Sequence, residues 1–389
     1  MKTTTIAAAV TLALTTGVNA DNSNRPTNEV SPELQNIHNR CIVRLNDEIS
    51  KFDVTGKARG MVASAQARGF SNAKADHIYQ HSIKGFSINM SCASAQQSFG
   101  DDIDIKNMSP DAIVSISAPP PGKGPGNGGG STSQTTPWSV TRVGGPVDAT
   151  GYTAWVLDTG IDLEHPDLNV DASRGFSAFT KGKNASVDDG QGHGTHVAGT
   201  IAAINNNIDV VGIAANATVI PVKVLDSRGS GSISGVIAGV DFVAANASPG
   251  DCANMSLGGG ANSSLDDAVE AAAQASGAYF VVAAGNDGDN ANNHSPARAN
   301  GNRVFTISAT DINDNMPSWS NYGNPPVDYA APGVSILSLK NGGGTTTMSG
   351  TSMASPAACA VIMLSNGNPS TDGTAGNDPD GNPDRIVHL

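Results

Sequence analysis

The sequence predicts an α/β fold in which helices cover both faces of a mostly parallel sheet, preceded by a small α+β domain. Two patterns support this prediction. After residue 136, continuous apolar strands alternate with helical segments, as in parallel sheets that are buried on both faces. Before residue 118, short strands and two helical segments follow the order β-α-β-β-α-β of the split βαβ, or ferredoxin-like, arrangement.

Residues 1–20 have the pattern of a secretory signal peptide. Lys2 supplies positive charge, residues 6–14 form an apolar run, and residues 18–20 are a small-residue cleavage site. The apolar run is too short to span a bilayer, and no other segment of the sequence has about 20 apolar residues. We therefore expect a secreted, extracellular protein without a membrane partner.

Composition limits the partners further. The net charge of −13 argues against nucleic-acid binding, which would need a basic face. The four cysteines form no Cys-x-x-Cys pair, which argues against zinc-ribbon and thioredoxin-like sites. Disulfides are compatible with an exported chain. We expect a soluble monomer.

The small domain covers residues 33–117. We expect a strand over 41–45, a helix over 60–69, strands over 77–81 and 85–90, a helix over 93–99 and a last strand over 112–116. In the split βαβ arrangement the first and third strands are antiparallel neighbours, so the start of one lies beside the end of the other. This arrangement predicts a disulfide between Cys41 and Cys92.

A linker over residues 118–135 is rich in Pro and Gly, and it combines a stiff extended piece with a flexible one. The large domain follows over residues 136–365. We expect strands over 153–157, 218–224, 252–257, 278–284 and 304–309, and helices over 194–204, 233–247, 263–276 and 357–364. Residues 366–389 are rich in Asn, Asp, Gly and Pro, and we expect an irregular tail.

Four short segments lie where elements of the large domain begin or end, and active sites of such sheets gather at the carboxyl ends of strands. Asp158 follows an apolar strand, and His193 opens a helix after a Gly-rich run. Asn286 ends another strand. Ser352 lies between small residues just before an apolar helical run.

These four residue types are those that acyl transfer from a serine requires. The reaction needs a nucleophile, a base within reach, an acid that orients the base, and donors for the oxyanion. Ser352, His193, Asp158 and Asn286 fit these roles in that order. A serine at a helix N-terminus has the added benefit of backbone N–H groups that stabilise negative charge.

Each residue also has a simpler interpretation when it is taken alone. Ser352 could be a helix cap, Asp158 a turn residue and Asn286 a left-handed turn position. His193 and His196 could bind a metal, but the zinc-protease pattern requires a Glu between histidines four residues apart. The Gly-rich run over 229–235 does not match a dinucleotide fingerprint, because its third Gly falls one place late.

Taken together, the segments resemble those of a known family. The order Asp, His, Ser is that of subtilisin, and over roughly residues 38–365 the chain resembles a secreted subtilase (subtilisin-like serine protease) of the proteinase K type with an inhibitory propeptide. The resemblance implies a serine endopeptidase, made as an autoprocessed zymogen, that acts on protein or peptide substrates and needs no cofactor for its chemistry. It assigns Asp158, His193 and Ser352 to the catalytic triad, and the Asn286 amide with the Ser352 backbone N–H to the oxyanion hole.

The resemblance also implies where ligands bind. Substrate is expected to enter as an extended strand between two backbone segments, which are formed by Gly229, Ser230 and Gly231 and by Ser256, Leu257 and Gly258. The small domain is expected to act as the inhibitor, with residues 115–121 in the cleft before maturation between Gly122 and Pro137. Asp328 matches a structural calcium position, which carbonyls near Asn302 and Val304 would complete. The alternative for Asp328 is an exposed loop residue.

The sequence departs from the family after the nucleophile. Members usually carry a His five residues after the serine, where this chain has Ala357. Cys359 lies two turns along the same helix face as Ser352, and we expect it to be a buried small hydrophobe. The sequence does not decide between a free Cys252 and a Cys252–Cys359 bridge. Relatives usually add helical segments after this helix, which leaves open a minimal core or a truncated product.

Two other functions are compatible with parts of the pattern. An esterase would use the same triad, but its Gly-x-Ser-x-Gly elbow is absent around Ser352. An inactive binding scaffold would keep the fold without its chemistry, and the four intact residues argue against it.

Overall fold

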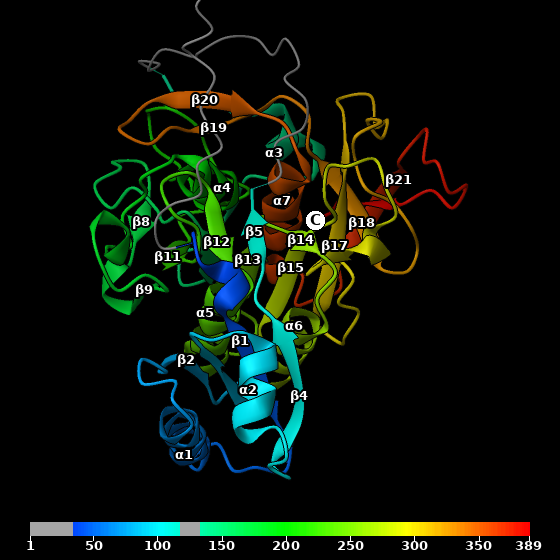
Figure 1. The fold of residues 1–389 in the computed structure, drawn as a ribbon. Helices are drawn as coiled ribbons and strands as arrows, with labels where there is room; N and C mark the ends of the chain where they lie inside the picture. Colours follow the sequence, from blue (N-terminus) through cyan, green and yellow to red (C-terminus); the bar gives the residue numbers. More distant parts are fainter. Residues whose placement is uncertain (1–33, 117–132) are drawn as a thin grey trace, which may run out of the picture.

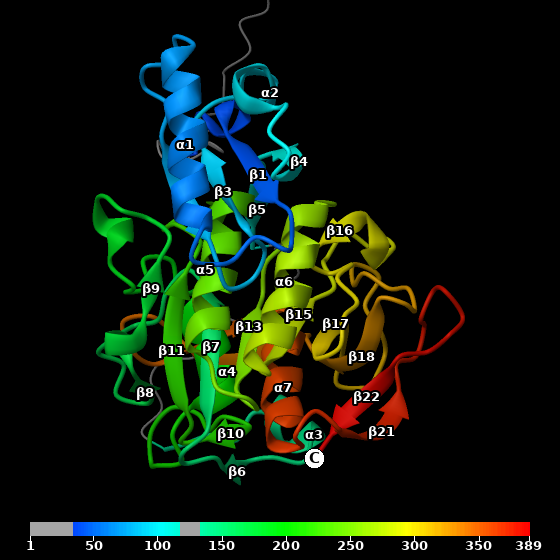
Figure 2. The same cartoon turned by 90° about the horizontal axis from the view of Figure 1, so that it is seen from below.

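The computed structural model describes residues 34–116 and 133–389. The predicted signal peptide and most of the predicted linker lie outside these residues. We call residues 34–116 the small lobe and residues 133–389 the large lobe. The small lobe packs on one side of the large lobe, against its helices α5 and α6 (Figures 1 and 2).

The small lobe has the predicted β-α-β-β-α-β order. Its elements, after a 3₁₀ turn at Ile37–Asn39, are β1 (Cys41–Leu45), α1 (Val54–Ala67), β2 (Ala75–Tyr79), β3 (Gly85–Ile88), α2 (Cys92–Phe99) and β4 (Ile105–Pro110). The four strands form an antiparallel sheet in the order β2-β3-β1-β4. This is the strand order of the ferredoxin-like arrangement.

The prediction for the last strand of this sheet was wrong. Residues 105–110 form the edge strand β4, although Lys106 and Asn107 are exposed and break its apolar alternation. The predicted strand over 112–116 exists only as β5 (Ile113–Ser115), and it pairs with the large lobe instead. A half-exposed edge strand carries too few apolar residues for periodicity to detect it.

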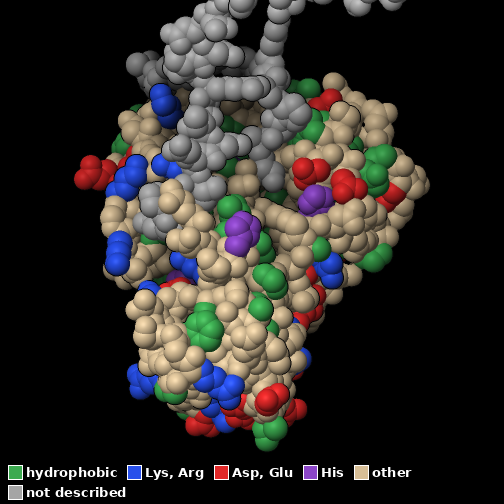
Figure 3. Space-filling model, viewed as in Figure 1, with side chains coloured by type: hydrophobic (Ala, Val, Ile, Leu, Met, Phe, Trp, Pro, Cys, Tyr) green, Lys and Arg blue, Asp and Glu red, His purple; other side chains and the backbone are tan. Residues whose placement is uncertain are grey.

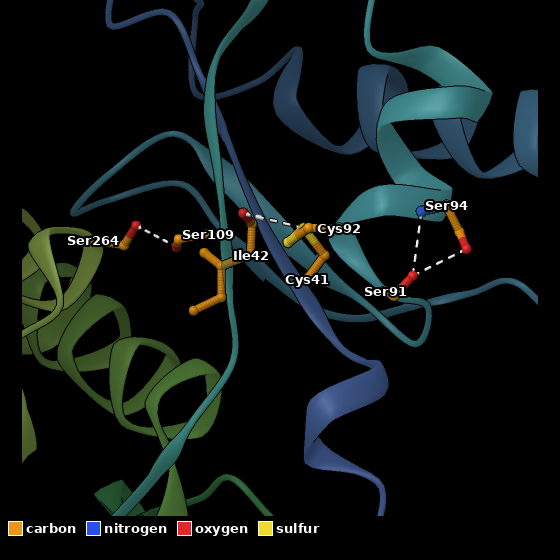
Figure 4. Close-up of a disulfide and its surroundings, with 7 residues drawn as sticks. All are labelled: Cys41, Ile42, Ser91, Cys92, Ser94, Ser109 and Ser264. Carbon is orange, nitrogen blue, oxygen red and sulfur yellow. Dashed lines mark hydrogen bonds between the residues drawn. A yellow bond between two sulfur atoms is a disulfide. The ribbon is translucent and has the colours of Figure 1, made fainter.

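The predicted Cys41–Cys92 disulfide is confirmed. The two Cα atoms are 4.9 Å apart, and the bridge joins the start of β1 to the start of α2 (Figure 4). Cys41 is paired with Ile88 at the end of β3, as the antiparallel neighbours require. Ser91 caps α2 by accepting a hydrogen bond from the Ser94 N–H at 3.2 Å.

The large lobe contains the predicted, mostly parallel sheet. Its strand order is β21-β22-β18-β17-β15-β13-β7-β11-β8, with β9 also pairing with β11, and of these pairs only β21–β22 is antiparallel. The strands are β7 (Thr153–Asp158), β8 (Asn169–Val170), β9 (Phe176–Ser177), β11 (Thr218–Lys223), β13 (Cys252–Met255), β15 (Tyr279–Ala283), β17 (Val304–Thr310), β18 (Val327–Pro332), β21 (Ser370–Thr374) and β22 (Arg385–His388).

Helices cover both faces of this sheet. They are α3 (Trp138–Arg142), α4 (His193–Ala202), α5 (Ile233–Asn246), α6 (Ser263–Ser276) and α7 (Thr351–Leu364). Short strand pairs complete the lobe: β6 (Val147–Asp148) with β10 (Ala214–Ala215), β12 (Ser230–Ser232) with β5, β14 (Gly259–Gly260) with β16 (His294–Ser295), and β19 (Ile336–Leu339) with β20 (Thr345–Met348). No helix among the described residues is long and apolar enough to cross a membrane.

Alternating side chains of β7 separate the two cores. Ala154 and Val156 belong to the core on the side of α4 and α7, whereas Trp155 and Leu157 belong to the core on the side of α5 and α6. Because both faces are buried, the strand is apolar at every position before Asp158 apart from its first residue. This explains why the sequence predicted the central strands correctly.

The prediction of an irregular tail was wrong. Residues 370–374 and 385–388 form β21 and β22, and β22 joins the edge of the main sheet beside β18 (Figure 2). Ile386 and Val387 are buried there, and the Asp384 carboxylate accepts hydrogen bonds from Ser308 and Asn324. The turn residues over 378–384 obscured this short apolar pair in the sequence.

A second disulfide joins Cys252 of β13 to Cys359 of α7, with Cα atoms 5.9 Å apart. The prediction that Cys359 is buried is confirmed, and the question of a Cys252–Cys359 bridge, which the sequence left open, is answered by the bridge. A strand and a helix far apart in sequence bring the two thiols together, and sequence spacing does not report such proximity.

The lobes meet through hydrogen bonds that end on carboxylates and backbone groups. Asp241 of α5 accepts from the backbone N–H groups of Gln80, His81 and Ser82, at 2.7–3.0 Å. Asp111 of the small lobe accepts from the Ser234 N–H in the first turn of α5 at 3.0 Å. A carboxylate at a helix N-terminus is favoured by the helix dipole.

Further pairs extend this contact. Arg44 forms an ion pair with Asp267, and the Ser109 and Ser264 hydroxyls lie 3.0 Å apart (Figure 4). The far end of the small lobe carries side chains of both charges on its surface (Figure 3). Within the small lobe, Lys106 also forms an ion pair with Asp47.

Candidate active site

Asp158 and His193 form a buried hydrogen-bonded pair. Asp158 is the last residue of β7 and His193 the first residue of α4. His193 Nδ1 lies 2.9 Å from each Asp158 carboxylate oxygen, and Asp158 also accepts from the Thr159 N–H at 2.7 Å. The carboxylate thus fixes both the orientation of the imidazole and the nitrogen that carries the proton, which leaves Nε2 as the acceptor.

The environment of His193 sets its basicity. Burial alone would lower the pKa of His193, but the Asp158 carboxylate outweighs burial and the pKa lies above its usual value. Asp189 adds to this effect at longer range. An imidazole with a raised pKa is a stronger base.

Asp189 is a structural residue that sequence reasoning missed. Its carboxylate accepts from the backbone N–H groups of Gln191 and Gly192, each at 2.9 Å, and from the Thr195 N–H at 3.0 Å. It also accepts from the Thr159 hydroxyl at 2.9 Å, which links it to the residue after Asp158. The sequence offers no clear signal for this role, because the residue directly before α4 is Gly192 and the first turn holds no acidic residue.

Lys223 was also missed. It ends β11 beside Asp158 and is almost fully buried. Its ammonium group donates to the backbone carbonyls of Thr159 and Asp188, and burial lowers its pKa. A lysine at the end of an apolar strand carries no sequence signal that separates it from a surface lysine.

Ser352 is the second residue of α7 and is buried. Its hydroxyl donates to the Ser256 carbonyl oxygen at 3.3 Å. Among the described residues no hydrogen bond joins Ser352 to His193, so the hydroxyl must turn before His193 can accept its proton. Catalytic hydrogen bonds are often unformed until substrate binds.

Asn286 is held beside the start of α7. Its side-chain oxygen accepts from the Thr351 N–H at 2.8 Å and from the Thr351 hydroxyl at 3.0 Å. The Thr351 hydroxyl also accepts from the Gly285 N–H at 3.1 Å. With the oxygen fixed in this way, the amide N–H₂ group of Asn286 has one orientation relative to Ser352. Gly285 has a φ of +109°, and a Cβ there would collide with Asn321.

The residues predicted to bind substrate flank β5 of the small lobe (Figure 1). Ser115 donates to the Gly258 carbonyl at 3.0 Å and accepts from the Gly258 N–H at 3.1 Å. On its other side β5 pairs with β12, and the Ile116 N–H donates to the Gly229 carbonyl at 3.0 Å. The two predicted segments therefore hold an extended strand between them through backbone hydrogen bonds on both sides.

A cavity of about 310 Å³ opens beside this strand. It is lined by Leu257–Gly260, Ala283–Gly285, Ser352 and Ser115, among other residues. In the part of the chain that the structure describes, its lining consists mostly of small and polar residues, and Leu257 is its one large apolar side chain. Asp287 and His294 are its ionisable lining residues.

Comparisons with known proteins agree with this geometry. The model of the subtilase family matches residues 150–374, which is more than half of the chain. The chain belongs to the subtilase family. Over 372 residues it is 37% identical to the alkaline serine protease ver112 of Corniculantispora psalliotae, covering 92% of this chain and 87% of that relative.

Other relatives support the same assignment. Proteinase R of Parengyodontium album is 36% identical over 305 residues, which cover 73% of this chain and 70% of that protein. The crystal structure of a cold adapted subtilisin-like serine proteinase matches with a TM-score of 0.57 and 36% identity, over 64% of this chain and 97% of that one. This subtilase is therefore a serine protease of subtilisin type whose substrates are proteins or peptides.

His196 of this subtilase is a core residue. Its Nε2 lies 3.0 Å from the Ile336 carbonyl oxygen, and burial lowers its pKa to about 3. Among the described residues, no group of three or more His, Cys, Asp or Glu side chains could hold a metal ion. This favours the structural interpretation of His196 over the zinc alternative.

Asp328 lies in β18, away from the triad residues. One carboxylate oxygen accepts from the Thr306 N–H at 2.9 Å. Burial raises its pKa to about 6, and no basic side chain of the two described lobes counteracts this effect. Asp328 is therefore a partly buried carboxylate rather than the exposed loop residue of the alternative interpretation.

Proposed function

We propose that this subtilase is a secreted serine endopeptidase that hydrolyses peptide bonds through an acyl-enzyme formed on Ser352. The observation that supports the proposal is a pair of hydrogen-bonded units on two helices in contact, Asp158 with His193 at the start of α4 and Asn286 with Thr351 at the start of α7. His193 is hydrogen-bonded to Asp158 at 2.9 Å, and Asn286 is fixed next to the helix that bears Ser352.

The proposed reaction begins when Ser352 turns from the Ser256 carbonyl toward His193. The Ser352 oxygen attacks the peptide carbonyl carbon while His193 Nε2 takes its proton. Asp158 stabilises the imidazolium, and His193 then gives the proton to the leaving amine as the C–N bond breaks. Water repeats the sequence on the acyl-enzyme and regenerates the Ser352 hydroxyl.

The oxyanion of each tetrahedral intermediate is proposed to accept hydrogen bonds from the Asn286 amide and the Ser352 backbone N–H. Thr351 supports both donors, because it binds the Asn286 oxygen and directly precedes Ser352 in α7. Donors fixed before the reaction stabilise charge without reorganising when it forms.

We further propose that the small lobe is the inhibitory propeptide of a monomeric zymogen. Its support is β5, which occupies the strand position between Gly229 and Gly258. The proposed maturation region between Gly122 and Pro137 lies mostly outside the described residues. N-terminal sequencing of the mature form tests this part of the proposal.

Ser352→Ala tests the central proposal. The variant is expected to remain uncut, to hydrolyse no casein above background and to resist labelling by a fluorophosphonate, since each requires the Ser352 oxygen. Ser365→Ala is the matched control, because Ser365 lies at the other end of α7 and donates only to carbonyls of that helix. Full hydrolysis by Ser352→Ala would refute the nucleophile, and labelled wild type that cleaves esters but not casein would indicate an esterase.

We also propose that Asp328 binds a structural calcium ion together with backbone carbonyls near Asn302 and Val304. The residues fit a hard cation, since a partly buried carboxylate without a basic partner lacks a counter-charge and oxygen is the ligand that calcium prefers. The ion would stabilise the fold and would take no part in the chemistry.

Stability measured against pH tests the calcium proposal. The raised pKa means that folded Asp328 holds its proton more tightly than the unfolded chain does. In EGTA its contribution to the free energy of unfolding should therefore fall as pH rises from 3.8 to about 6. Calcium should reverse this loss at neutral pH. Asp328→Asn should remove both the loss and the calcium response, and an unchanged response to calcium in this variant would refute the site.

A further inference from the structure

Pro356 leaves the Ser352 carbonyl without its usual partner in the first turns of α7. In an α-helix the carbonyl of residue i accepts from the N–H of residue i+4, so the partner of the Ser352 carbonyl would be residue 356. Proline has no N–H. The Ser256 hydroxyl takes this place and donates to the Ser352 carbonyl oxygen at 2.8 Å.

This bond fixes the direction of a longer chain of hydrogen bonds. Because the single proton of the Ser256 hydroxyl is used on Ser352, its oxygen is left as an acceptor. Asn254 fills that role by donating from its amide nitrogen at 2.9 Å. The Asn254 oxygen in turn accepts from the Ser355 hydroxyl at 2.8 Å.

This chain of hydrogen bonds lies in the interior of the large lobe. Asn254, Ser256 and Ser355 are all fully buried. Bulk water therefore cannot replace a lost hydrogen-bond partner, and each missing hydrogen bond would leave a buried polar group unsatisfied. The Cys252–Cys359 disulfide ties the same strand to the same helix two turns further on.

We propose that Asn254 is a positioning residue for the nucleophile, and that it acts through Ser256 on the main chain of Ser352. The inference rests on the proposed role of Ser352. The first turn of α7 is then held from two sides: Asn286 binds Thr351, and the Asn254–Ser256 pair binds the Ser352 carbonyl. Together they set the positions of the Ser352 hydroxyl oxygen and backbone N–H relative to the predicted substrate-binding segment that begins at Ser256.

Asn254→Asp tests the proposal with almost no change of shape. A carboxylate accepts from both neighbouring serines, so the Ser256 hydroxyl turns toward residue 254 and the Ser352 carbonyl loses its donor. We expect kcat of the matured enzyme to fall about tenfold, as for the loss of one well-placed hydrogen bond, with KM changed less than about twofold. The rate constant for fluorophosphonate labelling should fall in parallel.

Ser256→Ala removes the last link and serves as the second variant if the buried carboxylate of Asn254→Asp impairs folding. It should show the same loss of kcat. The double variant of positions 254 and 256 should lose no more than either single variant, because both act through one bond. Losses that multiply would show that Asn254 does not act through Ser256.

Pro356→Ala provides a sharper test, because it restores an N–H at position 356 that can bind the Ser352 carbonyl. Measured against Pro356→Ala alone, adding Asn254→Asp should cost less than about twofold in kcat. A tenfold cost in both backgrounds would overturn the proposal.

Ser276→Ala is the control for a merely structural effect, since it removes a buried hydroxyl that donates to Ala272 at 2.7 Å in the distant helix α6. It should lower the melting temperature and leave the labelling rate constant unchanged. If Asn254→Asp behaves like this control, the positioning role is refuted while the role of Ser352 stands. Activity that survives Ser352→Ala would instead refute the proposed function itself.

Discussion

The candidate active site and the contact between the lobes use buried carboxylates in opposite ways. In the large lobe, Asp158 and Asp189 bind groups of their own lobe and organise the start of α4 around His193. Across the contact between the lobes, Asp111 and Asp241 each bind backbone N–H groups of the other lobe. The first kind of carboxylate orders the candidate site, and the second kind joins the two lobes.

The hydrophobic cores of the two lobes also differ in number. The small lobe has one main core and one disulfide, whereas the large lobe has a core on each face of its sheet. Only a few small-lobe side chains, such as Tyr79 and Val114, belong to a core of the large lobe. The candidate active-site residues therefore all lie in the large lobe, while the small lobe contacts that lobe through the strand β5 and a polar interface.

The largest effect is expected within the large lobe, from Asn286→Ala. The variant should lose about 10²–10³-fold in kcat with little change in KM, because it removes an oxyanion donor that acts in the transition state. Steady-state kinetics of the matured enzyme measure this loss. Asn324→Ala, which removes an amide bound to Asp384 near the far edge of the sheet, is the control. A loss below about threefold at Asn286 would contradict its assignment to the oxyanion hole.

Each lobe contains one of the two disulfides, so removing each disulfide tests the stability of one lobe. Replacing both cysteines of either pair by Ala should cost about 2–4 kcal/mol of stability in the lobe concerned. The Cys252–Cys359 variant should lower the melting temperature of the matured enzyme. The Cys41–Cys92 variant should lower the yield of folded precursor and leave the matured enzyme unchanged. Equal effects of both variants on the matured enzyme would refute the division between the lobes.

A smaller effect is expected at the contact between the lobes. Asp241→Ala removes the acceptor of three backbone N–H groups and of the Ser82 hydroxyl. The small lobe should be held about 10- to 100-fold more weakly, since hydrogen bonds to a charged group are strong ones. The lag before activity appears in the full-length chain should shorten. Asp372→Ala, in the exposed strand β21, should leave the lag unchanged, and an unchanged lag in Asp241→Ala would show that the contact does not control activation.

The sequence correctly predicted the elements in which nearly every residue is buried and therefore apolar. Strands such as β7 and β11 are buried on both faces and are apolar between their first and last residues, and Asp158 and His193 were predicted from short motifs at the ends of elements. The edge strand β4 and the terminal strand β22 were missed, because each has only a few buried residues among polar ones.

The residues that hold the candidate active-site side chains in place could not be predicted from the sequence either. Asp189, Lys223 and the Cys252–Cys359 bridge depend on neighbours that only the folded chain supplies. The Ser256 hydroxyl depends on a proline a hundred positions away in sequence. Periodicity and local motifs describe the chain near a residue, whereas burial and hydrogen-bond partners are properties of the tertiary fold.

The strand position between Gly229 and Gly258 has a consequence for which proteins the enzyme would digest. An occupant of this position must expose several consecutive backbone N–H and C=O groups in extended form, and a natively folded target has these groups engaged in its own helices and sheets. Under the proposed function, the digestion rate of a target would follow how often its chain opens locally, more than which residues it contains. Such an enzyme would digest proteins that unfold locally faster than stable ones, and its digestion rates would report the equilibrium constants of local unfolding in its targets.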